Sequence, residues 1–465
     1  MKELAQKARD KCRQKGATFA DVRAVHTEGN SILLQDGRAD KVNAWSGTGL
    51  GVRVLVEGAW GFASISAARE EQMDECLEAA FAMARASRQR LGELSALAQV
   101  EAVEDQVPAQ YDKDPRAVPI EEKMSALRGY EQAAITRHKD KLANTTVSYN
   151  DSTERTVLCN TRGTLIESEV VRTMVGTTMT AQDGDVRQRG WEHKGKLCGF
   201  ELIEGLTAED LSLKAADRAV ALLKARRAPA GKFPVVFAPS IAGLFVHEAL
   251  GHNAEADLVL AGESILEGKL GTRIAADCVN VVDDGTIAQS WGSYKYDSEG
   301  VPAQRRQIIK DGVLVGYMHS LQTAAKLGTP PNGSARAEGY YNRPVVRMSN
   351  TFIVPGRQSF AELIKDIDEG LYMSGGHWGY VMCEKGQYTC HAGEGWMIRN
   401  GQLAEHIRDV SISGMILDTL ASTEGVSDAF EMEMPGNCGK GGQSMPVNGG
   451  GPHVRVREVV VGGQE

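Results

Sequence analysis

The sequence predicts an α+β protein in which two domains of helices and antiparallel sheet precede a large, antiparallel β-rich C-terminal domain. Its 465 residues exceed what one small core can organise, so two or three domains are expected. Helical and strand periodicities alternate in the first half, whereas strand patterns dominate the second. The 51 glycines and 14 prolines, without a low-complexity run, indicate many tight turns rather than disorder.

The first expected domain, residues 1–112, reads as a helix, a set of strands and a second helix. Residues 3–15 form an amphipathic helix pattern, and residues 21–56 contain β-branched runs between glycine turns. A helix with one apolar face follows near residues 68–87. The polar, proline-containing stretch 90–118 is typical of a linker.

The second expected domain, residues 113–228, repeats this plan with its own antiparallel sheet. Pro119 stands where a helix can begin, and residues 144–193 alternate polar and apolar side chains as strands do. Thr207 to Asp210 resembles a capping box that opens a helix reaching about Arg227.

The third expected domain, residues 229–465, is β-rich and carries one important helix. An apolar strand at 233–238 precedes Ser240, a candidate N-cap for the helix that bears the sequence HEALGH. The tripeptides DDG, KDG and RNG are turn or hairpin signals. Only two further short helices are expected, near 360–368 and 414–421.

The composition argues against several classes of function. A net charge of −9 without a basic stripe argues against nucleic-acid binding. No apolar run approaches about 18 residues, so no membrane span is expected. The N-terminus lacks the apolar core of a signal peptide, which predicts a cytoplasmic protein. Eight dispersed cysteines without a CxxC pair do not form a disulfide framework.

The candidate catalytic motif is HEALGH, which places His247, Glu248 and His252 within six residues. Two imidazoles can bind a metal, and an adjacent glutamate can take a proton from water. The histidines are five residues apart, so at about 100° per residue they lie roughly 140° apart on a regular helix. The helix must therefore end or bulge between them, and Gly251 is a residue type that allows a break. The alternative is a chance cluster with a histidine at a helix C-terminus.

A third metal ligand is predicted at Cys438, within the glycine-rich sequence GNCGKGGQSMPVNGGG. A cysteine flanked by so much glycine is not expected in a packed core, and its thiolate would complete a Cys-His-His set with one open position. The alternatives are an exposed thiol or a phosphate-binding loop, although the pattern GxxxxGK[ST] is absent.

HEALGHNAEAD together with GNCGKGGQSMPV resembles the TldD/PmbA family of metalloproteases, also described as modulators of DNA gyrase. The stretches GVRVLVEGAWGFAS and RMSNTFIVPG extend the similarity, which spans essentially the full chain. The intact HExxxH motif is that of the TldD-type subunit. The resemblance implies the metal ligands His247, His252 and Cys438, with Glu248 as the general base.

The predicted function is a zinc-dependent metallopeptidase that hydrolyses small peptides or unfolded polypeptides. Iron and cobalt stay open, because the Cys-His-His set tolerates them. An extended substrate could add to a strand edge near the site. The resemblance implies a dimer, either with itself or with a PmbA (TldE)-type subunit. An amidase or deformylase and a non-enzymatic modulator of a protein partner are the alternatives. The roles of Cys383, Cys390 and His391 stay open.

Overall fold

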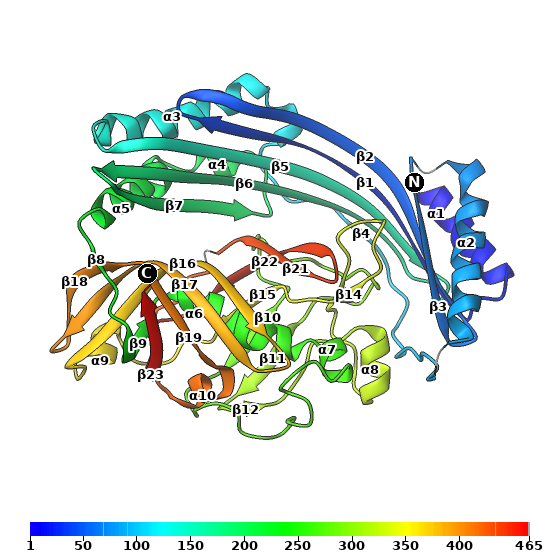
Figure 1. The fold of residues 1–465 in the computed structure, drawn as a ribbon. Helices are drawn as coiled ribbons and strands as arrows, with labels where there is room; N and C mark the ends of the chain where they lie inside the picture. The colour runs from blue at the N-terminus through cyan, green and yellow to red at the C-terminus, as the bar shows by residue number, and fades with distance from the viewer. Residues whose placement is uncertain (68, 91, 433, 464–465) are drawn as a thin grey trace.

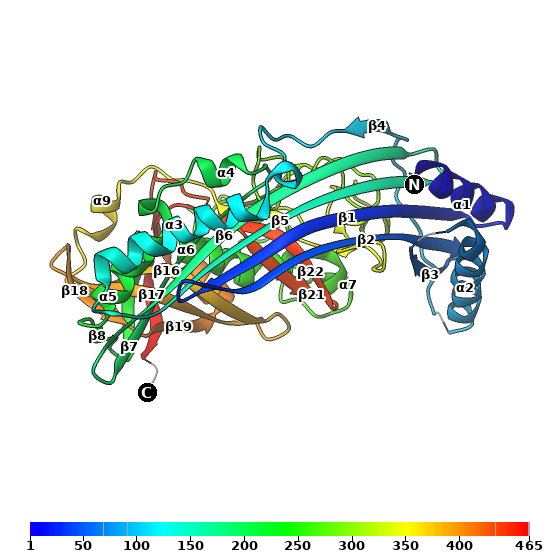
Figure 2. The same ribbon diagram turned by 90° about the horizontal axis from the view of Figure 1, so that it is seen from above.

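The computed structural model describes residues 1–67, 69–90, 92–432 and 434–463, and it confirms an α+β fold. A long, curved sheet arches over a β-rich C-terminal part, as Figures 1 and 2 show from two directions. Within the described ranges, no helix is both long enough and apolar enough to cross a membrane.

The arched sheet has seven strands in the order β3-β2-β1-β5-β6-β4, with β7 also paired to β6. Four of its strands are unusually long, so that the sheet reaches across the whole molecule (Figure 1). The strands are β1 (Phe19–Gln35), β2 (Arg38–Val56), β3 (Ala59–Ser66), β4 (Glu104–Val107), β5 (Leu142–Asn160), β6 (Leu165–Asp183) and β7 (Val186–Lys196).

This sheet corrects the expectation of a separate sheet in each of the first two domains. β1 pairs antiparallel with β5 from Asp21 opposite Asn160 to Gln35 opposite Thr146, so strands on both sides of residue 112 share one sheet. β4, inside the expected linker, adds a parallel strand to β6. The domain boundaries at residues 112 and 228 stay a prediction.

Helices cover one face of the arched sheet, each through its apolar side. The helices are α1 (Lys2–Gln14), α2 (Glu70–Arg88), α3 (Ile120–His138), α4 (Glu201–Glu204) and α5 (Lys214–Leu222), the last preceded by a π-turn at Glu209–Leu213. Gly61 and Gly190 let α2 and α5 approach closely, because a Cβ atom there would lie 1.9 and 2.0 Å from a helix carbonyl oxygen.

The predicted end of the last of these helices is wrong by about one turn. α5 ends at Leu222, and Arg226–Arg227 instead form the short strand β8, which pairs in parallel with β18. The capping interaction at Thr207 is present, since its backbone N–H and hydroxyl both donate to Asp210. The two arginines therefore join a sheet rather than close a helix.

The C-terminal part holds two sheets that together create its core. One has six strands in the order β12-β11-β10-β15-β22-β21, and in the other β16, β9, β23, β19 and β17 pair in a closed ring. The first comprises β10 (Val281–Asp284), β11 (Arg305–Lys310), β12 (Val313–Leu314), β15 (Asn350–Ile353), β21 (Gly436–Lys440) and β22 (Gln443–Gly450). The ring comprises β9 (Gly231–Phe237), β16 (Glu369–Met382), β17 (Gln387–Arg399), β19 (Val410–Met415) and β23 (Val454–Gly463), with β18 (Gln402–Arg408) and β20 (Thr423–Val426) attached.

Two details of this part differ from the sequence prediction. The β9–β16 and β15–β22 pairs are parallel, so the structure is not wholly antiparallel. Besides the expected α9 (Phe360–Ile364) and α10 (Ile416–Ala421), the helices α7 (Ala256–Leu260) and α8 (Leu321–Leu327) interrupt the strands. Both are shorter than two full turns, which is too short for a periodicity to stand out.

A buried ion pair connects the arched sheet to the C-terminal part. Arg53 on β2 bonds Asp21 on β1 and, at 2.9 Å, Glu299 from the loop after β10. All three side chains are at most 8% exposed. Because the charges are buried but mutually compensated, they hold the sheet above the strands that carry the candidate site.

Candidate metal centre

The HEALGH segment bulges between its two histidines. α6 (Pro239–Val246) begins with Pro239 in its first turn and Ala238 as N-cap, so the prediction of Ser240 as N-cap is wrong. A π-turn follows at His247–Gly251, and then a 3₁₀ turn at His252–Ala254. The backbone N–H of His252 donates to the carbonyl of His247, and this five-residue hydrogen bond brings residues i and i+5 to one side.

Gly251 serves this bulge in a different way from the one predicted. Its backbone is helical, with φ of −55° and ψ of −53°, so no glycine-specific conformation breaks the helix. A Cβ atom at this position would instead lie 2.0 Å from Sδ of the buried Met348. The glycine is therefore required for close packing.

The structure brings His247, His252 and Cys438 together across 186 residues of sequence. Their ligand atoms all lie within 4.8 Å of one another, and Nε2 of His252 is 3.2 Å from Sγ of Cys438. The two imidazole rings stand nearly perpendicular, with centroids 5.3 Å apart. A thiolate and two imidazoles converging in this way are the donor set of a borderline-soft divalent metal such as zinc.

Cys438 is buried, contrary to the expectation that its glycine-rich context would keep it out of a core. It lies on β21 opposite Met445 on β22, and it is 7% exposed. Gly441 and Gly442 form the turn of this hairpin with positive φ angles of 59° and 72°. The glycines thus make the hairpin turn that returns β22 beside the cysteine.

A charged network behind His252 fixes its orientation. Nδ1 of His252 lies 3.1 Å from Oε2 of the fully buried Glu255, and Nζ of Lys440 lies 3.0 Å from the same oxygen. Lys440 also bonds Asp257 at 2.6 Å. When Nδ1–H donates to Glu255, the lone pair of Nε2 points to Cys438, as a metal ligand requires.

The protonation states suit metal binding. Burial would raise the pKa of the Cys438 thiol, but His247 and His252 outweigh it and hold that pKa at about 4. Burial likewise opposes charge on Glu255, yet Lys440 and His252 lower its pKa to about 2. The cysteine is therefore a thiolate at neutral pH, which is the form that binds a metal.

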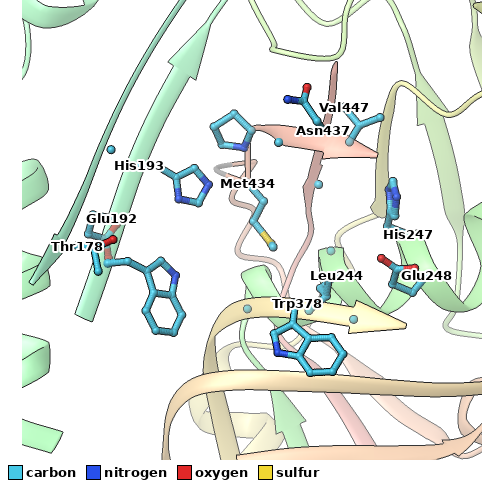
Figure 3. Close-up of a pocket in the computed structure, with 18 of the residues that line it drawn as sticks. Thr178, Glu192, His193, Leu244, His247, Glu248, Trp378, Met434, Asn437 and Val447 are labelled. Carbon is cyan, nitrogen blue, oxygen red and sulfur yellow. The ribbon is translucent and has the colours of Figure 1, made fainter. Parts of the chain in front are cut away.

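Glu248 lies beside the three ligands, on the wall of a cleft of about 710 Å³. The cleft separates the arched sheet from the C-terminal part, and Figure 3 shows His247 and Glu248 on one side with Glu192 and His193 on the other. Gly379 on β16 leaves room for the carboxylate, since a Cβ atom there would lie 2.8 Å from Cγ of Glu248. A substrate in this cleft would pass directly over the carboxylate.

The other candidate ligands, Cys383, Cys390 and His391, do not join this group among the described residues. Cys390 is fully buried, and burial raises the pKa of its thiol, so it stays neutral. The ring of His391 stacks on Trp378 with centroids 4.0 Å apart.

Two residues of the site, Glu255 and Lys440, were not predicted from the sequence. Glu255 stands three residues after His252, and Lys440 stands two residues after Cys438 on the same strand. Spacings of three on a helix and two on a strand place side chains on one side, so both could have been inferred.

Comparison with known proteins gives consistent matches over the whole chain. Models of the PmbA/TldA metallopeptidase domain 1, central domain and C-terminal domain match residues 20–84, 113–223 and 230–463. A protein of Methanothermobacter thermautotrophicus named metalloprotease is 40% identical over 445 residues, covering 96% of this chain and 95% of its own. A Saccharolobus solfataricus protein named zinc metalloprotease TldD homolog is 28% identical over 454 residues, covering 97% and 98%. The crystal structure of TldE from Thermococcus kodakarensis shares the fold, with a TM-score of 0.74, 17% identity and 99% coverage of both chains.

Proposed function

Since the chain belongs to the TldD/PmbA family of metallopeptidases, we propose that it is a zinc-dependent peptidase that hydrolyses peptides and unfolded polypeptides. The observation that supports this most is the convergence of one thiolate and two imidazoles beside the carboxylate of Glu248 on a cleft wall. The relatives named as metalloproteases, one of them as a zinc metalloprotease, agree with this proposal.

His247, His252 and Cys438 would hold the metal, and Glu255 would keep His252 in the correct tautomer. When bound, the metal supplies a Lewis acid that polarises the peptide carbonyl and makes water more acidic. Glu248 accepts the proton of the attacking water and then passes it to the departing amine. The buried setting on the ligand side strengthens these charge interactions.

An extended polypeptide is the substrate that the cleft fits best. β21 carries Cys438 and lies at the edge of its six-stranded sheet, pairing with β22 among the described strands. Its residues Gly436 and Asn437 line the cleft. A peptide strand can therefore hydrogen-bond to this edge through its backbone, which favours loose sequence specificity and needs an unfolded substrate.

Glu248→Gln tests the proposal. The amide cannot accept the proton, so kcat on an unstructured peptide should fall by at least about a hundredfold, while metal content per chain stays unchanged. The control Glu121→Gln removes an exposed carboxylate on α3, away from the cleft, and should keep full activity. Full hydrolysis by Glu248→Gln would refute the assigned mechanism.

A further inference from the structure

A second cavity, of about 140 Å³, lies on the same face of the arched sheet and is rich in arginine. We call it the arginine cavity. Its walls include the guanidinium groups of Arg23, Arg172 and Arg336 and the carboxyl groups of Glu154 and Asp297. Burial, and the neighbouring Glu299, raise the pKa of Asp297, which reduces its negative charge. Positive charge therefore exceeds negative charge around this cavity.

Arg172 on β6 has an unmet need for an anion. Its Nε atom is buried without a hydrogen-bond partner, and the described part of the chain contains no ion pair of its guanidinium. Burial lowers the pKa of Arg172, and Glu154 offsets this only in part. Nε of Arg23 is likewise buried without a partner, and burial lowers the pKa of Arg23 to about 10. Such unpaired buried charge costs free energy unless a ligand compensates it.

The arginine cavity and the cleft share two walls. On β22, Met445 lines the arginine cavity and Val447 lines the cleft. On β6, Arg172 lines the first and Gly176 the second. At about 3.3 Å per residue, these separations are roughly 7 and 13 Å, or two to four residues of an extended peptide.

We propose that the arginine cavity binds a carboxylate of the peptide substrate, located two to four residues from the bond that is cleaved. The carboxylate is a Glu or Asp side chain or the peptide's C-terminus, and Arg172 binds it with Arg23 and Arg336 beside it. This inference rests on the proposed peptidase function, because it needs a peptide lying in the cleft. It assigns the enzyme a preference for acidic substrates.

The test uses a series of unstructured peptides that are identical except for one Glu placed in turn at each position around the cleaved bond. The wild-type enzyme should cleave the peptide with Glu two to four residues away about tenfold to a hundredfold more efficiently, in kcat/KM, than the neutral parent. Arg172→Gln should abolish this preference and cleave the neutral parent at the wild-type rate. The control Arg128→Gln, which removes an exposed arginine on α3, should keep the preference.

A melting measurement separates binding from a structural role. Because Arg172 is an unpaired charge, Arg172→Gln should unfold at the same or a higher temperature than the wild type without peptide. A lower melting temperature with equally reduced cleavage of all peptides would make the arginine structural and overturn the proposal. An undiminished acidic preference in Arg172→Gln would also overturn it.

Two further arms identify other sources of failure. Thermal stabilisation by inorganic phosphate that depends on Arg172, without any acidic preference in cleavage, would mean a site for free oxyanions and overturn the peptide assignment. If the wild type cleaves no peptide, the peptidase proposal fails first. Fluorescence anisotropy with labelled acidic and neutral peptides then still decides the inference, since Arg172-dependent binding of the acidic peptide supports it and equal binding overturns it.

Discussion

Glu255 influences the metal ligands through His252 and not by direct contact with a substrate. Its carboxylate is fully buried and contacts Nδ1 of His252 and Nζ of Lys440. Glu255→Gln keeps the shape but removes the charge that orients the imidazole. We expect the zinc affinity to fall by about tenfold to a hundredfold, as is usual for partners behind a metal ligand.

Asp257→Asn is the matched control for Glu255→Gln. It also neutralises a carboxylate on Lys440, at 2.6 Å, but it does not touch His252. Competition of each variant with a chromogenic chelator measures the affinity. If both variants lose the same affinity, the network acts through Lys440 and the assigned role of Glu255 is wrong.

At the residue scale, the ligand types could be predicted from the sequence but their surroundings could not. His247, Glu248 and His252 share one short motif, so the motif alone indicated metal chemistry. Cys438 stood out only through its glycine neighbours and the family resemblance. Its burial follows from the hairpin that pairs it with Met445, which no local pattern around the cysteine expresses.

Gly251 tests the packing of the π-turn at the element scale. Gly251→Ala places a Cβ atom 2.0 Å from Sδ of Met348, so the bulge or the methionine must shift. We expect the free energy of unfolding to fall by about 1–3 kcal/mol, as for other overpacked cores. Urea denaturation measures the change.

Gly129→Ala is the matched control, because Gly129 lies in α3 and a Cβ atom added there would contact no other part of the chain within 4 Å. Alanine there should stabilise the helix by up to about 1 kcal/mol. In a Met348→Ala background, Gly251→Ala should cost less than in the wild type. An equal cost in both backgrounds would show that Met348 is not the obstacle.

His319, just before α8, predicts how stability depends on pH. It is 5% exposed, and burial lowers its pKa to about 4. Its neutral form is therefore favoured in the folded chain, so its contribution to stability is complete above the unfolded pKa of about 6.5 and is lost as the pH falls toward 4. The expected slope is about 1.4 kcal/mol per pH unit in that range.

Urea unfolding of the wild type and His319→Gln between about pH 7.5 and pH 5 measures this slope. The variant lacks the titrating ring, so its stability should fall less steeply on acidification. Parallel curves for the two proteins would contradict the assignment to His319.

Elements with a long, clear periodicity were predicted well, and short ones were not. The helix expected at 3–15 is observed as Lys2–Gln14, and the one expected near 68–87 is observed as Glu70–Arg88. β8 escaped prediction because its two arginines become a strand only through pairing with β18, far along the chain. Tertiary pairing there overrides local propensity.

At the scale of the whole molecule, the sequence indicated the α+β class but not how the sheets combine. The β1–β5 pairing, the β15–β22 pairing and the closed ring of strands join segments that are far apart in sequence. Register and neighbour choice of such strands depend on non-local packing, which periodicity cannot reveal. Assembly with itself or with a PmbA (TldE)-type subunit likewise stays a prediction of the family resemblance.

The most direct test of the central claim is a zinc titration of chelator-treated protein while the hydrolysis of an unstructured peptide is recorded. The Cys-His-His group holds one ion, so the rate should rise from near zero and level off at one equivalent of zinc per chain. The same titration of Cys438→Ser should need a large excess of zinc. Hydrolysis that proceeds equally without added metal, or a plateau unaffected by Cys438→Ser, would contradict the account.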